Sequence, residues 1–180
     1  MRLFVAVNFS GETKEKLFEL REQIRVQASR GNFSRPENFH LTLAFLGETP
    51  EDKLRLLFRI MGEINSPPFE IIFNRIGSFT HSRKELWWIG ADAERGGLPL
   101  LGAIHRQLLS RLDEEGFSVD KRPFNAHITL GREVKHSAPI VTETPEIVVR
   151  VDRISLMKSE HIGGILTYTE LMGKPLIGRS

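Results

Sequence analysis

The sequence contains no cysteine among its 180 residues. This absence excludes disulfides, thiolate nucleophiles and cysteine-ligated zinc or iron–sulfur sites, and it is compatible with a reducing cytosol. No apolar run approaches the roughly 18 to 20 residues that a membrane span needs, and no signal-peptide pattern is present. We therefore expect a cytoplasmic protein.

A large excess of one charge is also lacking. The chain has 25 Lys and Arg against 23 Asp and Glu, which gives a net charge of +2. That excess is too small to indicate nucleic-acid binding by itself, and a mixed solvated surface accounts for it. Hydrophobic residues make up 40% of the chain and charged residues 27%. This composition suffices for a buried core, and residues 1–180 fit one compact domain or two small lobes that share an interface, with no obligate protein partner evident.

The hydrophobic spacing alternates between strand and helix periods, with no long linker between them. Helices are expected from Ser10 to about Ser29, from Thr49 to about Ile64 with Thr49 as its cap, and from Pro99 to Glu115. Strands are expected over residues 2–8, 39–46, 69–73, 76–80, 86–91, 126–130, 146–151, 153–158 and 165–171. The chain therefore mixes helices and strands.

The most informative feature is an internal repeat. The string Arg35-Pro36-x-Asn38-x-His40-Leu41-Thr42-Leu43 reappears 87 positions later as Arg122-Pro123-x-Asn125-x-His127-Ile128-Thr129-Leu130, with six of nine positions identical. A structural duplication alone would keep apolar positions more readily than polar ones. Here the polar residues are those that match, so we interpret the repeat as functional.

Each repeat carries a histidine and a threonine two positions apart on a predicted strand. Side chains two apart share a face, so His40 and Thr42 point one way while Leu41 and Leu43 point into the core. His127 and Thr129 repeat this arrangement. If the two halves are related by a pseudo-two-fold axis, two imidazoles and two hydroxyls meet across one cleft. Displacement at phosphorus needs groups on opposite sides, and histidine can serve as acid or base near neutral pH.

Other site types fit this sequence less well. The motifs hold two histidines and no carboxylate, which is a poor ligand set for zinc or iron, so no metal and no cofactor is expected. No G-x-S-x-G, P-loop or G-x-G-x-x-G string occurs. The remaining histidines lack the repeated context, and His105 is expected at the surface of a helix; the four are His81, His105, His136 and His161.

His40-Leu41-Thr42-Leu43 and His127-Ile128-Thr129-Leu130 resemble the paired H-x-T-x motifs of the 2H phosphoesterase superfamily. The string from Arg35 to Glu48 resembles more specifically its branch of RNA 2′,3′-cyclic phosphodiesterases, many of them also known as 2′-5′ RNA ligases. One departure is visible, because Asn125-Ala126 precede His127 where this branch more often has x-Pro. Further matching segments are Arg2–Val7, Phe79, Trp88, Arg122–Phe124 and Ile154–Ser159.

The resemblance implies a bilobal, duplicated α+β fold in which two antiparallel sheets face each other across a central cleft, with helices outside. It also implies metal-independent hydrolysis of a terminal RNA 2′,3′-cyclic phosphate to a 2′-phosphate. In that scheme His40 gives a proton to the departing 3′ oxygen and His127 activates water. Thr42 and Thr129 hold the phosphate.

A few residues outside the paired motifs are also candidates. Arg132, at the expected end of the second motif strand, could complement phosphate charge or simply be exposed. Phe45, Phe79 and Trp88 could stack on a terminal base, although core packing is the more common role for an aromatic residue.

Three alternative functions stay open on the sequence. The first is ATP-independent 2′-5′ RNA ligation, in which a hydroxyl attacks the cyclic phosphate in place of water; no K-x-D-G adenylylation string occurs. The second is phosphodiester cleavage of another cyclic or 2′-5′ linked nucleotide. The third is a non-catalytic module that binds RNA ends.

Overall fold

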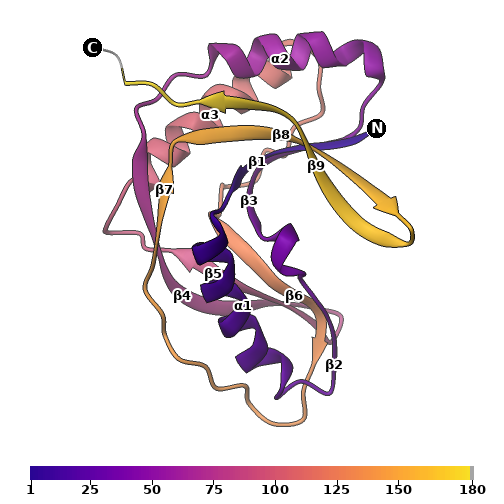
Figure 1. The fold of residues 1–180 in the computed structure, drawn as a ribbon, viewed down its shortest axis with the longest axis vertical. Coiled ribbons are helices and arrows are strands. Elements are labelled where there is room, and N and C mark those ends of the chain that lie inside the picture. Colours follow the sequence, from indigo (N-terminus) through magenta and orange to yellow (C-terminus); the bar gives the residue numbers. More distant parts are fainter. Residues whose placement is uncertain (179–180) are drawn as a thin grey trace.

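Two antiparallel sheets organise the chain in the computed structural model, which describes residues 1–178 (Figure 1). The β1 sheet has the strand order β3 (His40–Glu48), β1 (Arg2–Asn8), β8 (Arg153–Ile162) and β9 (Ile165–Pro175). The β6 sheet has the order β2 (Arg30–Phe33), β6 (His127–Lys135), β5 (Lys84–Ala91), β4 (Phe69–His81) and β7 (Ile147–Val151). The predicted α+β class with two antiparallel sheets is confirmed.

Three α-helices lie outside the sheets within the described residues (Figure 1). The helix α1 (Gly11–Arg25) follows β1 in the chain but packs against β2, β6 and β7 of the other sheet. The helices α2 (Leu54–Glu63) and α3 (Leu98–Glu114) contact each other, and α3 also contacts β3. Thus α1 follows a strand of the β1 sheet and packs on the β6 sheet, whereas α3 follows a strand of the β6 sheet and contacts the β1 sheet.

The two motif strands bury the same positions. Leu41 and Leu43 on β3 are 1% and 3% exposed, and Ile128 and Leu130 on β6 are fully buried. All four belong to one continuous apolar cluster that includes residues of both sheets. Their burial leaves the intervening side chains on the opposite face of each strand, because successive strand residues alternate.

The element boundaries also follow the internal repeat. The helices α1 and α3 begin at Gly11 and Leu98, and the strands β3 and β6 begin at His40 and His127. Both pairs are separated by 87 positions (98 − 11 and 127 − 40). The spacing of the motifs is therefore also the spacing of the elements that carry them.

Some predicted boundaries were wrong for reasons outside local sequence. The helix α1 ends at Arg25 rather than near Ser29, because the backbone N–H of Ser29 donates to Lys135 O and leads the chain into β2. Thr49 does not cap a helix. Its backbone N–H donates to Met1 O at 2.7 Å, and α2 begins only after a short 3₁₀ turn at Glu51–Lys53.

No helix within residues 1–178 combines the length and the apolar character that crossing a membrane would require.

Candidate active site

The strands β3 and β6 contact each other where the two sheets meet, and each begins with the histidine of its motif. A cavity of about 400 Å³ opens there. Its lining holds the five residues predicted for catalysis and phosphate binding, together with nine others: Asn32, Phe33, Ser34, Arg35, Asn38, His40, Thr42, Phe45, Leu86, His127, Thr129, Arg132, Leu166 and Tyr168. Of the three aromatic candidates, Phe45 lines this cavity, whereas Phe79 and Trp88 do not. The structure therefore brings together all five predicted residues, which lie up to 92 positions apart (132 − 40).

The orientation of both imidazoles is set by backbone carbonyls. Nδ1 of His40 lies 2.7 Å from Asn38 O, and Nδ1 of His127 lies 2.8 Å from Asn125 O. A carbonyl oxygen can only accept a hydrogen bond, so each Nδ1 carries a proton and donates it. Nε2 of each ring is thereby left as the atom that can gain or lose a proton.

His40 lies in an apolar slot on the cleft face of the β1 sheet. Its ring centroid is 4.9 Å from that of Phe4 and 5.2 Å from that of Tyr168, which approaches edge-on. Nε2 of His40 lies 2.9 Å from Thr42 Oγ1. Phe4 belongs to a small buried cluster with Ala6 and Met157, separate from the main core. This cluster forms the floor beneath the imidazole.

The electrostatic surroundings disfavour the charged form of His40. Burial is the main cause that lowers the pKa of His40, and the positive charges of Arg132, His127 and Lys14 lower it further. The hydrogen bond to Asn38 O opposes this shift. In the free protein at neutral pH, His40 is therefore neutral, and the Thr42 hydroxyl donates to its Nε2.

His127 has a more open environment. Its ring meets the edge of Phe79 at a centroid distance of 5.7 Å. Within residues 1–178, neither Nε2 of His127 nor the hydroxyl of Thr129 has a hydrogen-bond partner. These two groups are free to bind a ligand in the cavity.

Arg132 is not at the end of its strand, as the sequence suggested, but within β6, which continues to Lys135. The longer strand pairs with β2 through Asn32, a pairing that cannot be read from β6 alone. Arg132 forms no ion pair with any residue of the described chain, and the cavity lining contains no Asp or Glu. Its charge therefore acts on the cavity without a neutralising carboxylate.

Sequence reasoning missed Tyr168 and the structural use of Asn38. Tyr168 is the single tyrosine of the chain, and burial raises the pKa of its hydroxyl. The side chain of Asn38 donates to Leu166 O at 3.0 Å and so ties the first motif to β9. The role of Asn38 could have been suspected from the sequence, because the asparagine is repeated in both motifs. Tyr168 carried none, because it lies outside both motifs.

The other histidines lie outside this cavity. His105 on α3 is half-buried rather than at the surface, since its ring stacks on Phe124 at a centroid distance of 4.1 Å. His136 interacts with Glu85 at 3.1 Å. His81 and His161 are exposed at hairpin ends. Among residues 1–178, no group of three or more His, Cys, Asp or Glu side chains is placed to hold a metal ion.

Comparison with known proteins identifies relatives over most of the chain. The model of the 2′-5′ RNA ligase superfamily matches residues 13–163. The chain is 36% identical over 144 residues to an RNA 2′,3′-cyclic phosphodiesterase of Archaeoglobus fulgidus, covering 79% of this chain and 78% of that protein. It is 30% identical over 170 residues to the protein of that name from Escherichia coli K12, covering 94% and 93%.

Solved structures agree with these sequence relatives. The crystal structure of Escherichia coli LigT in its apo form superimposes with a TM-score of 0.83 at 28% identity, over 98% of both chains. LigT complexed with 3′-AMP gives the same TM-score and identity over 97% of both chains. With the paired motifs in one cavity and a family match over most of its length, the chain belongs to the 2′-5′ RNA ligase superfamily of 2H phosphoesterases.

Proposed function

We propose that this protein hydrolyses the terminal 2′,3′-cyclic phosphate of RNA to a 2′-phosphate, using His40 and His127 and no metal. The observation that carries the proposal is the pair of imidazoles in one cavity without carboxylates, each with Nδ1 on a backbone carbonyl, so that Nε2 is the ring atom that can gain or lose a proton. The names of the relatives from Archaeoglobus fulgidus and Escherichia coli support the substrate class.

The proposed step moves one proton at each side of phosphorus. Nε2 of His127 takes a proton from water as the water oxygen bonds to phosphorus. The bond between phosphorus and the 3′ oxygen breaks, and Nε2–H of His40 gives its proton to that oxygen. The phosphate stays on the 2′ oxygen. Because the entering and leaving oxygens are roughly in line, acid and base must approach from opposite sides, which suits histidines on two facing sheets.

His40 must gain a proton before it can act as the acid, although its pKa is lowered in the free protein. A cyclic phosphate is an anion, and an anion beside an imidazole favours the imidazolium. Substrate binding therefore brings the negative charge that stabilises the protonated form of His40. The Thr42 hydroxyl, which donates to neutral His40, is then released to donate to a phosphate oxygen.

Thr42, Thr129 and Arg132 complete the proposed phosphate site. The Thr129 hydroxyl and the Arg132 guanidinium line the cavity without competing partners in the described chain. Hydrogen bonds to the non-bridging oxygens strengthen as charge accumulates there.

We also propose that the chain forms one domain of two pseudo-symmetric lobes, one carrying His40-x-Thr42 and the other His127-x-Thr129. The shared spacing of the helices α1 and α3 and of the strands β3 and β6 supports this view. The same cavity would also permit ligation, in which an RNA hydroxyl replaces water.

The test uses an oligoribonucleotide that ends in a 2′,3′-cyclic phosphate, after exhaustive chelation of the protein. We expect hydrolysis to persist, its pH profile of kcat/KM to be bell-shaped, and ³¹P NMR to show a 2′-phosphomonoester. Initial rates of joining to a second oligomer are measured in parallel. Restoration of activity only by added zinc or manganese, a 3′-phosphate product, or joining faster than hydrolysis would each contradict the proposal.

A further inference from the structure

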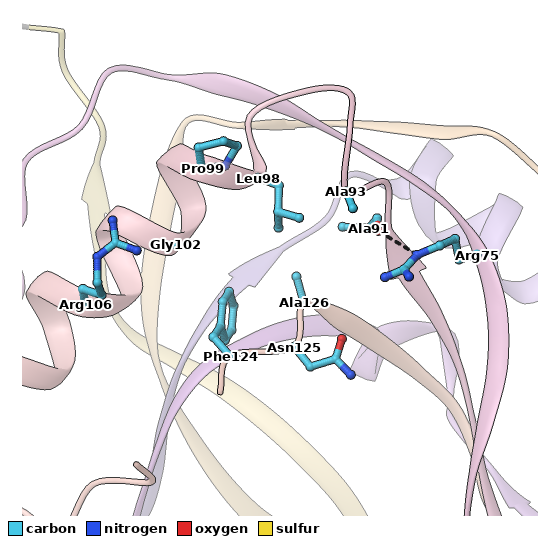
Figure 2. A pocket seen from close by; sticks show the side chains of 10 residues that line it. All are labelled: Arg75, Ala91, Ala93, Leu98, Pro99, Gly102, Arg106, Phe124, Asn125 and Ala126. Atoms are coloured by element: carbon cyan, nitrogen blue, oxygen red, sulfur yellow. Dashed lines mark hydrogen bonds between the residues drawn. The ribbon is translucent and has the colours of Figure 1, made fainter. Parts of the chain in front are cut away.

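A second cavity of about 520 Å³ lies between α3 and the β6 sheet, and neither His40 nor His127 lines it (Figure 2). Small residues leave the space: Ala91 and Ala126 on the sheet side and Gly102 on the helix. A side chain at Gly102 would meet the Arg106 guanidinium, since a Cβ there would lie 3.4 Å from Nη1. The Arg106 guanidinium therefore lies back along the helix, beside Gly102. The complete lining is Arg75, Ala91, Ala93, Leu98, Pro99, Gly102, Arg106, Phe124, Asn125 and Ala126.

Two arginines face this cavity from opposite walls. Figure 2 shows Arg75 reaching in from the sheet and Arg106 lying along α3 at the opposite edge of the cavity. Nε of Arg75 donates to Ala91 O at 3.1 Å, which fixes the guanidinium and leaves its terminal nitrogens available. Neither arginine forms an ion pair with another residue in the range 1–178, in contrast to Arg95 and Arg111, which each contact two carboxylates.

The lining is depleted of negative charge. It contains no Asp or Glu, and the cavity of the paired histidines contains none either, although 23 of the 180 residues are acidic. An arginine fork without a carboxylate partner is suited to bind phosphate through two parallel hydrogen bonds. The chemistry of this cavity therefore matches a phosphate of a polyanion.

A third depression of about 470 Å³ connects the two cavities. It shares Thr42, Phe45 and His127 with the cavity of the paired histidines, and Phe124 and Asn125 with the cavity beside α3. Asn125 links the two directly, because its backbone O holds Nδ1 of His127 while its residue also lines the second cavity.

Exposed aromatic rings line this connecting depression. Phe45 is 63% exposed and Phe79 is 42% exposed, and both face the depression. The lining also includes one carboxylate, Asp120, which forms an ion pair with Arg122. Aromatic rings along a groove can stack on successive bases of a single strand. The three depressions thus offer, in order, a phosphate site, stacking surfaces and a second phosphate site.

We propose that the cavity between α3 and the β6 sheet binds a backbone phosphate of the RNA strand upstream of the terminal cyclic phosphate, through Arg75 and Arg106. The inference rests on the proposed function and makes an oligonucleotide, rather than a cyclic mononucleotide, the preferred substrate. The strand would run from His127 past Phe79 and Asn125 to the two arginines.

The experiment compares 2′,3′-cyclic AMP with oligoribonucleotides of two to eight nucleotides that end in a 2′,3′-cyclic phosphate. The variants are R75A, R106A and the double variant. R55A is the matched control, because Arg55 is an exposed arginine on α2 outside this cavity. Circular dichroism establishes that each variant is folded.

For the wild type we expect kcat/KM to rise once the strand is long enough to reach the arginines. The double variant should lose about tenfold on the longer oligomers, the scale of one charge-assisted hydrogen bond, while its rate on 2′,3′-cyclic AMP stays unchanged. The slope of log affinity against log salt should become shallower by about 0.7 for each phosphate that the variant no longer neutralises. R55A should match the wild type.

Several results would overturn the proposal. These are an equal loss on both substrates, an equal loss in R55A, or a wild-type enzyme that gains nothing from strand length while it hydrolyses the cyclic mononucleotide. If the wild type hydrolyses neither substrate, the proposed function fails instead. In that case, fluorescence anisotropy with a labelled octamer ending in a 2′-phosphate tests the proposed phosphate site independently of catalysis. Undiminished binding by the double variant would contradict the site.

Discussion

The strands that carry His40 and His127 have the same motif and the same alternation of burial, but their histidines have different neighbours. His40 lies between Phe4 and Tyr168 with Nε2 bonded to Thr42, whereas His127 meets only the edge of Phe79 and keeps Nε2 free of partners in the described chain. A repeated strand thus fixes where an imidazole sits. Phe4 and Tyr168, which lie outside the repeat, bury the imidazole of His40, and this burial lowers its pKa.

The largest expected effect concerns the two histidines themselves. H40A and H127A should each lower kcat on a cyclic-phosphate oligomer by roughly 10² to 10⁴, the usual contribution of a general acid or base. The double variant should lose less than the product of the two losses, because the groups act as a unit. H161A is the control, since His161 is exposed at the end of β8 and does not line this cavity. A folded H127A that keeps more than about a tenth of wild-type activity would contradict the mechanism.

Replacing the threonines should have smaller effects, and these effects should differ between Thr42 and Thr129. T42A and T129A each remove one hydrogen bond to a charged oxygen, on the order of 1.5 to 3 kcal/mol of transition-state stabilisation. T42A also removes the partner of His40 Nε2, so it should change the titration of His40, while T129A should not. Thr→Ser at either position keeps the hydroxyl and should restore most of the activity. Identical effects of T42A and T129A on His40 would remove the proposed difference between the lobes.

The next prediction tests the charge environment of His40 directly. Because burial and Arg132 lower the pKa of His40, its imidazole signals in NMR should titrate at lower pH than those of an ordinary free histidine. R132Q removes a positive charge, so it should raise the pKa of His40. Inorganic phosphate adds a negative charge in the cavity and should raise it as well. A His40 titration that neither R132Q nor phosphate moves would contradict the proposed coupling between substrate binding and protonation.

Much of this site was predictable because side chains two positions apart on a strand lie on the same face. Once Leu41 and Ile128 are assigned to the core, His40, Thr42, His127 and Thr129 must share the opposite faces. Tyr168 was not predictable in the same way, because β9 reaches His40 only through the pairing of the β1 sheet. The cavity formed by Arg75 and Arg106 likewise depends on tertiary packing between a sheet and a helix.

The missed elements have the same physical origin. The strand β2 contains Arg30, Gly31, Asn32 and Phe33, a short segment with weak strand propensity that forms because the edge of β6 is available to pair with it. Thr49 has the sequence of a helix cap, but its backbone groups bind those of Met1 instead. In both cases the observed conformation is the one that pairs the backbone with a segment distant in the sequence.

The smallest expected effect concerns the repeated asparagines, Asn38 and Asn125. The half-buried side chain of Asn38 donates to Leu166 O and holds the first motif against β9, whereas the side chain of Asn125 is exposed and has no hydrogen-bond partner in residues 1–178. N38A should therefore destabilise the protein by about 1 kcal/mol, the net value of one hydrogen bond, and N125A by less than about 0.5 kcal/mol.

For a chain of this size, a loss of about 1 kcal/mol lowers Tm by about 2–4 °C, which calorimetry resolves. N38D keeps an acceptor of similar size but cannot donate to a carbonyl, so it should be at least as destabilising as N38A. Equal Tm values for N38A and N125A would show that the hydrogen bond to Leu166 contributes nothing, and the asymmetry between the lobes would then be confined to the aromatic neighbours of the two histidines. A lower Tm for N38A alone would instead place the unrepeated strand β9 among the elements that hold His40 in its slot.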